Sequence, residues 1–200
     1  MNELEKASHE KLKARFERIC KFAYDHEVPL MIDAEETWIQ QAVDEMVLDM
    51  MRKYNKEKCI IHITYQMYLK NSLSALQNLE KTAREEGFFA GAKLVRGAYM
   101  EKESRRANEM DYEDPINPGK AATDKMYDDG LRFCVEKRDI LSVCAGTHNE
   151  NSSLLLAQLM DEKDIDHSDK RFWFSQLYGM SDHISFNLAN AGYNVAKYLP

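Results

Sequence analysis

The feature that most constrains the fold is a series of short apolar segments that recur along the chain. Six such segments, each bounded by polar residues or glycine, occupy residues 28–35, 59–66, 92–99, 141–149, 171–179 and 194–200. Their length and composition are typical of strands that are buried on both faces, as in a parallel sheet. Most of them begin about thirty residues apart, which is the size of a βαβ unit.

The stretches between these segments carry helical periodicity. Apolar residues at three- and four-residue spacing predict helices over 37–55, 69–87, 121–137, 150–163 and 181–192. A leading amphipathic helix is predicted from an apolar face made of Leu12, Phe16, Ile19, Cys20 and Ala23. The interval after residue 99 is longer, and the motif YEDPINPG within it predicts a turn-rich insert.

Strands that alternate with helices fit either a (βα)8 barrel or a doubly wound sheet. Polar residues follow every predicted strand, and a barrel builds its site from those strand ends, whereas a doubly wound sheet uses one switch point. No GxGxxG and no GxxxxGK[ST] motif is present. We therefore predict an α/β fold, a distorted (βα)8 barrel of TIM type that is incomplete, with about six of the eight strands. Residues 1–200 form this partial barrel domain, in which 1–27 are the leading helix and 28–200 are six strand–helix units.

Composition excludes several classes of protein. The net charge of −7 argues against a nucleic-acid partner, which calls for a basic face. The four cysteines lack CxxC spacing, which favours buried free thiols over disulfides or a metal centre. No apolar run reaches the length of a membrane helix, and the first 24 residues have no signal-peptide core. A soluble or peripheral protein is expected.

Asp33 stands at the exit of the first predicted strand, where a carboxylate could pair with a cation or a substrate amine. The alternative is that Asp33 or Glu35 only caps the following helix. A metal centre made of Asp33, His62 and His148 is a further alternative, although no HxH or HExxH pair supports it. His62 lies within a strand and fits a hydrogen-bonded core residue better.

Two basic residues, Lys93 and Arg96, occupy an otherwise apolar strand and need anionic or polar partners there. Gly97 and Ala98 follow and allow the backbone to approach a flat or large ligand, such as a flavin ring or a phosphate. Structural ion pairs inside the barrel explain the two cations equally well. Residues 147–149 (Thr-His-Asn) offer several hydrogen-bonding groups at the end of another strand.

Seven motifs resemble, in order, those of the proline dehydrogenase family, and they are closest to its stand-alone enzymes. They are IDAEETW, TYQMYLK, GAKLVRGAYMEKE, YEDPINP, GTHNENS, FSQLYGMSDHISFNLA and YNVAKYLP. The resemblance implies a distorted barrel that holds noncovalent FAD at the C-terminal ends of its strands. It also implies oxidation of L-proline to Δ1-pyrroline-5-carboxylate, with the electrons passing to a membrane quinone and a peripheral contact with that membrane. A bacterial protein would then be cytoplasmic or peripheral, and a eukaryotic one mitochondrial.

The resemblance also assigns residues. Those expected to bind FAD are Gln66, Lys93, Arg96, Gly97, Ala98, Thr147, His148 and Asn149. Those expected to form the catalytic proline pocket are Asp33, Tyr99, Leu177 and Tyr198, and none is expected to bind a metal.

Members of the family have two strands before IDAEE and, after YLP, a final helix whose arginines clamp the substrate carboxylate. The resemblance therefore implies a chain truncated at both ends, which could be inactive as a fragment. Hydroxyproline dehydrogenase shares these motifs and stays an alternative. A metal-dependent barrel hydrolase and a non-catalytic binding module are the alternatives from other classes.

Overall fold

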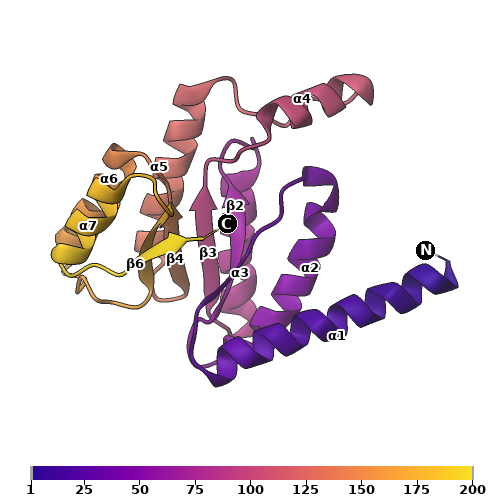
Figure 1. Cartoon of the computed structure of the whole chain (residues 1–200), viewed down its shortest axis with the longest axis horizontal. Coiled ribbons are helices and arrows are strands. Elements are labelled where there is room, and N and C mark those ends of the chain that lie inside the picture. The colour runs from indigo at the N-terminus through magenta and orange to yellow at the C-terminus, as the bar shows by residue number, and fades with distance from the viewer. Residues whose placement is uncertain (1, 200) are drawn as a thin grey trace.

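The computed structural model describes residues 2–199, and its centre is one curled sheet (Figure 1). Six strands, all parallel, pair in the order in which they follow along the chain. They are β1 (Leu30–Ile32), β2 (Ile61–Gln66), β3 (Ala90–Val95), β4 (Leu141–Gly146), β5 (Phe172–Leu177) and β6 (Val195–Tyr198). All six predicted strands are confirmed, and their sequential parallel order is that of a βα barrel.

Each predicted helix is also present. The helices are α1 (Glu3–Asp25), α2 (Thr37–Tyr54), α3 (Ser72–Glu86), α4 (Met100–Glu109), α5 (Lys120–Glu136), α6 (Glu150–Glu162) and α7 (Asp182–Asn190). Helix α4 was not predicted, because the insert was interpreted as turns. Its buried residues are Glu103 and Ala107, so it has no apolar stripe from which periodicity could be recognised.

Helix α1 extends from the body along one edge, with the N-terminus far from the sheet (Figure 1). Its predicted apolar face is only partly buried: Cys20 and Ala23 are covered, while Leu12 and Ile19 are about half exposed at 52% and 54%. The helix therefore rests on α2 through its C-terminal half. None of the helices within residues 2–199 combines the length and hydropathy needed to cross a membrane.

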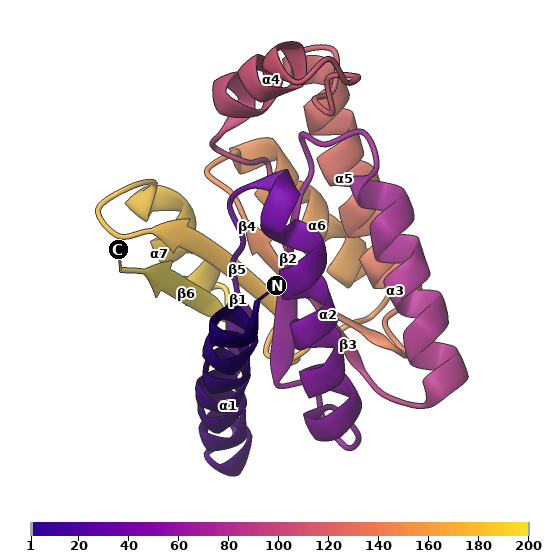
Figure 2. The same ribbon diagram turned by 90° about the vertical axis from the view of Figure 1, so that its right-hand side faces the viewer.

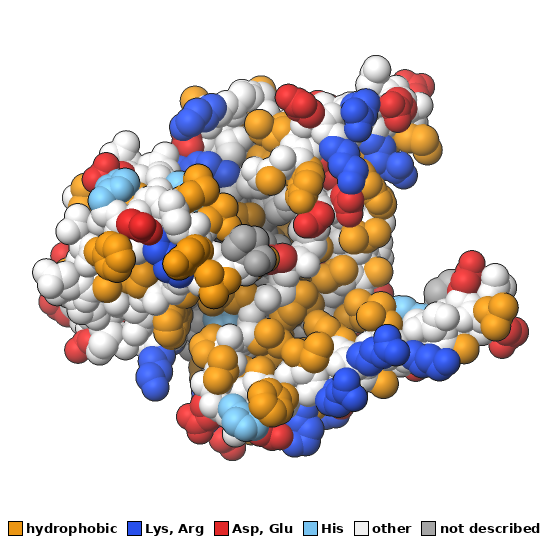
Figure 3. Space-filling view, in the orientation of Figure 1, with side chains coloured by type: hydrophobic (Ala, Val, Ile, Leu, Met, Phe, Trp, Pro, Cys, Tyr) orange, Lys and Arg blue, Asp and Glu red, His pale blue; other side chains and the backbone are white. Residues whose placement is uncertain are grey.

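The two faces of the sheet differ in chemistry. The outer face carries the apolar core, in which Ile63, Leu94, Val143 and Phe174 are buried among the covering helices. Helices α2, α3 and α5 lie against this face (Figure 2). The inner face is largely polar, and it is buried along parts of β2, β4 and β5, where His62, Thr64, Gln66, Ser142 and Ser175 are each less than 9% exposed. The prediction of strands buried on both faces does not hold for β1 and β6, which are only partly buried. A hollow edged by hydrophobic side chains opens near the centre of the face seen in Figure 3.

The insert between β3 and α5 is anchored by its turn motif. The Asn117 side chain donates to the Met67 carbonyl at 3.0 Å, and the Asn117 N–H donates to the Tyr68 carbonyl at 2.7 Å. These two bonds hold YEDPINP against the loop between β2 and α3. The motif therefore has a structural role, and it fixes the far end of the segment that contains α4.

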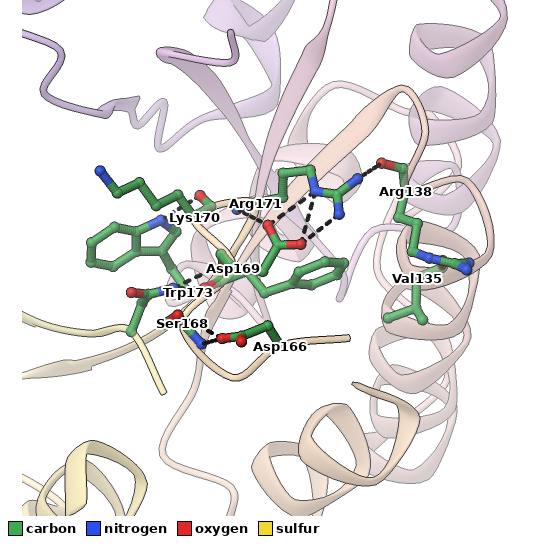
Figure 4. A network of polar contacts seen from close by, with 10 residues as sticks. Val135, Arg138, Asp166, Ser168, Asp169, Lys170, Arg171 and Trp173 are labelled. Atoms are coloured by element: carbon green, nitrogen blue, oxygen red, sulfur yellow. Dashed lines mark hydrogen bonds and ion pairs between the residues drawn. The ribbon is translucent and has the colours of Figure 1, made fainter. Parts of the chain in front are cut away.

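A cavity of about 410 Å³ opens at the N-terminal ends of the strands. Basic residues surround it, but Figure 4 shows that they diverge. Arg171 forms a bidentate ion pair with Asp169 and donates to the Arg138 carbonyl at 3.0 Å. The Arg138 guanidinium turns to the Val135 carbonyl, and Lys170 points away from both arginines (Figure 4). These residues brace the loop before β5 and do not converge on a ligand.

Candidate functional site

The C-terminal ends of the strands surround a larger cavity of about 600 Å³. This is the end of a βα barrel at which active sites are built. Every residue that the sequence proposed for cofactor or substrate lines this one cavity: Asp33, Gln66, Lys93, Arg96, Gly97, Ala98, Tyr99, Thr147, His148, Asn149, Leu177 and Tyr198. The fold therefore brings all of these residues to one cavity.

Asp33 and Lys93 form an ion pair on the wall of the cavity. The Lys93 ammonium donates to both carboxylate oxygens, at 2.9 and 3.0 Å, and the Thr64 hydroxyl donates to Oδ1 at 2.6 Å. Lys93 Nζ also lies 5.2 Å from the centre of the Tyr198 ring. The capping alternative for Asp33 is wrong, because Glu36 occupies the N-cap of α2 and makes no side-chain cap bond.

Arg96 joins several elements beside the cavity. Its Nε donates to Asp124 at 2.7 Å, its Nη1 to the Thr147 hydroxyl at 2.7 Å, and its Nη2 to the Ser152 hydroxyl at 3.0 Å. The guanidinium also stacks over the Tyr127 ring, 4.4 Å from its centre. Arg96 thereby links the end of β3 to α5, to the end of β4 and to α6. Both ion pairs that the sequence offered as an alternative explanation of the basic strand are therefore present.

The Thr-His-Asn segment leads from β4 into α6. Asn149 caps α6, because its Oδ1 accepts from the Ser152 N–H at 3.2 Å. Thr147 is buried, and its hydroxyl accepts from the Asn149 N–H at 3.0 Å. His148 is exposed, its Nδ1 lies 3.0 Å from the Ser181 hydroxyl, and partial burial lowers its pKa. Of the three side chains, the His148 ring is the one most open to a ligand.

Gln66 and Tyr99 hold the loop between β1 and α2. The Gln66 side-chain amide donates to the carbonyls of Ala34 and Glu35, both at 3.2 Å. Both of these bonds use the Gln66 Nε2, and Gln66 itself lines the cavity. A hydrogen bond to Glu35 raises the pKa of Tyr99. This loop, which carries Asp33, is thus held from the end of β2 and from the residue that precedes α4.

The model of the proline dehydrogenase family matches residues 2–200. The chain belongs to the proline dehydrogenase family. Its relatives include proline dehydrogenase 1, mitochondrial, of Caenorhabditis elegans, which is 43% identical over 187 residues, 91% of this chain and 30% of the relative. The human protein of the same name is 43% identical over 189 residues, 93% of this chain and 32% of the relative. The chain thus spans about a third of these relatives.

Solved structures share the fold. Proline utilization A from Bdellovibrio bacteriovorus, inactivated by N-propargylglycine, superposes with a TM-score of 0.87 and 22% identity, over 98% of this chain and 20% of that one. The predicted TIM-type barrel is therefore confirmed, and the six strands form a curled part of such a barrel.

The metal-centre alternative does not fit this family member. Asp33 is committed to Lys93, and His62 is buried within β2, where its Nδ1 donates to the Ile60 carbonyl at 3.1 Å. His148 contacts Ser181 instead. Within the described part of the chain, no three His, Cys, Asp or Glu residues group to hold a metal ion. The interpretation of His62 as a hydrogen-bonded core residue is confirmed.

The buried His62 makes the stability of the fold depend on pH. Burial lowers its pKa from 6.5 to about 4. The unfolded chain therefore binds the proton more tightly, so the stabilisation is complete above pH 6.5 and is lost as the pH falls toward 4. From pH 7.5 to pH 5 this single group should lower the free energy of unfolding by about 2 kcal/mol. Urea titrations at both pH values measure the change. His62→Gln should show a smaller pH dependence, and an equal dependence in both proteins would contradict the assignment.

Some residues of the pocket were missed from the sequence. Thr64, Gly146, Ser175 and Gln176 line it, as does Lys120 from the start of α5. Alternation along β2 carried a signal for Thr64, because it is two residues before Gln66 and shares its face. No sequence pattern pointed to Lys120, because it reaches the pocket only through the fold of the long insert.

Proposed function

We propose that this chain holds FAD in the cavity at the C-terminal ends of the strands and that the whole protein oxidises L-proline to Δ1-pyrroline-5-carboxylate. The observation that carries the proposal is the convergence on one cavity of all the residues that the family resemblance assigned to FAD or proline. The activity is assigned to the whole protein because the relatives are about three times as long as the matched segment. A quinone is the proposed electron acceptor.

The pocket fits a flavin dinucleotide in size and in donors. Its volume of about 600 Å³ lies in the range of cofactor sites. Gly97 has φ +115° and packs so closely on Tyr68 that a Cβ there would lie 1.4 Å from the ring. The N–H groups of Gly97 and Ala98 donate no hydrogen bond within residues 2–199, and Lys93 and Lys120 add positive charge. These groups suit phosphates and an electron-rich ring.

The residues of the chain divide between the two ligands. FAD, when bound, supplies the two-electron acceptor for the oxidation. Lys93 would supply positive charge to a reduced ring, and Asp33 fixes the direction of that ammonium. Leu177 and Tyr198, which are 40% and 49% exposed, present apolar surface to the ring of proline. The Gln66 Oε1 would accept from an N–H of the flavin.

The proposed location follows the relatives. The proteins of Caenorhabditis elegans and Homo sapiens are named as mitochondrial. In a eukaryotic source this chain would be mitochondrial too, and in a bacterium it would be cytoplasmic or peripheral. Transfer of electrons to a quinone requires contact with the membrane in either case.

The test is optical. The whole protein should be yellow as purified, and anaerobic L-proline should bleach its flavin absorbance. Parallel additions of hydroxyproline decide between the two substrates that share these motifs. A colourless protein, or a flavin that proline leaves oxidised, would refute the proposal.

A further inference from the structure

Helix α4 packs beside the loop that carries Asp33. This loop, residues 33–36, joins β1 to α2, and both Asp33 and Glu35 line the pocket. The inner side of the loop is held by Gln66 and Lys93. Its outer side meets α4, the helix that the sequence did not predict.

The contact is made by a buried carboxylate. Glu103 of α4 has 0% of its surface exposed. It accepts from the Thr37 N–H at 2.8 Å and from the Thr37 hydroxyl at 2.6 Å. Thr37 is the first residue of α2, whose own N-cap residue provides no side-chain bond. Glu103 therefore supplies, from another helix, the acceptor and the negative charge that the start of α2 needs.

A part-buried ion pair and an exposed aromatic contact flank this bond without replacing it. Lys102 pairs with Glu36, and the cationic groups of Lys102 and Arg106 lie 5.4 and 4.4 Å from the centre of the Trp38 ring. Trp38 is 41% exposed, and such surface contacts add little each. A buried carboxylate is costly unless hydrogen bonds satisfy it, and both bonds found here go to Thr37.

We propose that Glu103 is a positioning residue for the pocket. Helix α4 begins directly after Tyr99, so Glu103 is rigidly connected to the wall formed by residues 96–99. Its bonds to Thr37 tie that wall to the loop 33–36 on the neighbouring side. The carboxylate thereby sets where Asp33 and Glu35 stand relative to the cofactor wall. The consequence for proline rests on the proposed function, whereas the ordering of the loop does not.

The test compares three variants of the whole protein. Glu103→Ala removes both acceptors, and Glu103→Gln keeps the size and one carbonyl oxygen. Glu101→Ala removes an exposed carboxylate from the same turn of α4 and serves as the control. Hydrogen exchange of the peptide covering residues 33–40, flavin content, and KM and kcat for proline are measured for each.

In Glu103→Ala we expect exchange in residues 33–40 and KM each to rise roughly tenfold, with kcat and flavin content changing less, because a charged hydrogen bond is worth about that factor. Glu103→Gln should restore most of both values, and Glu101→Ala should leave them unchanged. If Glu103→Ala does not fold, Thr37→Val, which keeps the N–H bond, should show the same pattern in weaker form.

Two results would overturn the inference. One is unchanged exchange and KM in Glu103→Ala. The other is faster exchange throughout the sheet with kcat and KM altered together, because that describes general loss of stability. Exchange needs neither flavin nor proline, so a protein that loses order at residues 33–40 but never oxidises proline would support the role of Glu103 and refute the proposed function alone.

Discussion

Replacing Asp33 with alanine should lower kcat/KM for proline by roughly thirty- to a thousandfold, while most of the flavin stays bound. The carboxylate accepts two bonds from Lys93 and one from Thr64 on the wall of the pocket. Without it, an ammonium whose side chain is only 12% exposed loses its counter-ion and its fixed direction. The loss corresponds to about 2 to 4 kcal/mol, as for a buried charged hydrogen bond.

Tyr198 is the companion test on the other side of Lys93. Its ring lies 5.2 Å from the Lys93 ammonium and is half exposed to the pocket. Tyr198→Ala should weaken proline binding or turnover, and Tyr198→Phe separates the contribution of the ring from that of the hydroxyl. Steady-state kinetics together with the flavin spectrum measure both variants. Values of kcat/KM within a factor of about three in both Asp33→Ala and Tyr198→Ala would show the site assignment to be wrong.

The sequence was sufficient to place Asp33 and Lys93 at the same end of the fold. Asp33 follows a short apolar strand and Lys93 lies in the second half of another, and parallel strands bring such positions to one edge. The sequence could not show that the side chains of Asp33 and Lys93 form an ion pair. Their contact depends on strand register, in which Ile32 lies opposite Ile63 and Thr64 opposite Lys93, so that Asp33, the residue after Ile32, comes level with Thr64 and Lys93. Register is set by packing across the whole sheet, which no local pattern records.

Helix α4, in contrast, could not be predicted from the sequence. Its role in the fold depends on Glu103, which is fully buried, whereas glutamate side chains usually lie on the surface. Burial of that carboxylate makes sense only beside the first turn of α2, more than sixty residues earlier in the chain. Polar contacts between distant segments leave no periodic signal, whereas the apolar outer face of the sheet does.

Arg96 illustrates how one residue can serve both the fold and the pocket. The sequence explained it either as a cofactor contact or as a structural ion pair. The structure shows three hydrogen bonds to protein groups and a position on the pocket wall at the same time. A guanidinium can do this because its donors point in fixed, different directions.

Arg96→Ala should therefore deplete flavin and destabilise the apoprotein together. Three hydrogen bonds and the stacking on Tyr127 are lost, and Asp124 loses one of its two cationic partners. We expect the free energy of unfolding to fall by about 2 to 4 kcal/mol and the flavin-to-protein ratio to fall at least several-fold. Urea unfolding of the apoprotein and absorbance of the purified holoprotein measure the two effects.

A matched variant separates the effect of the positive charge of Arg96 from the effect of its hydrogen bonds to the fold. Asp124→Asn weakens the ion pair but leaves the bonds from Arg96 to Thr147 and Ser152 in place. If the positive charge of Arg96 holds the cofactor, Asp124→Asn should retain more flavin than Arg96→Ala at comparable loss of stability. Equal flavin loss in the two variants would mean that Arg96 acts only by bracing the wall. Full flavin retention in Arg96→Ala would remove it from the cofactor site, because neither the charge nor the bracing would then be needed for binding.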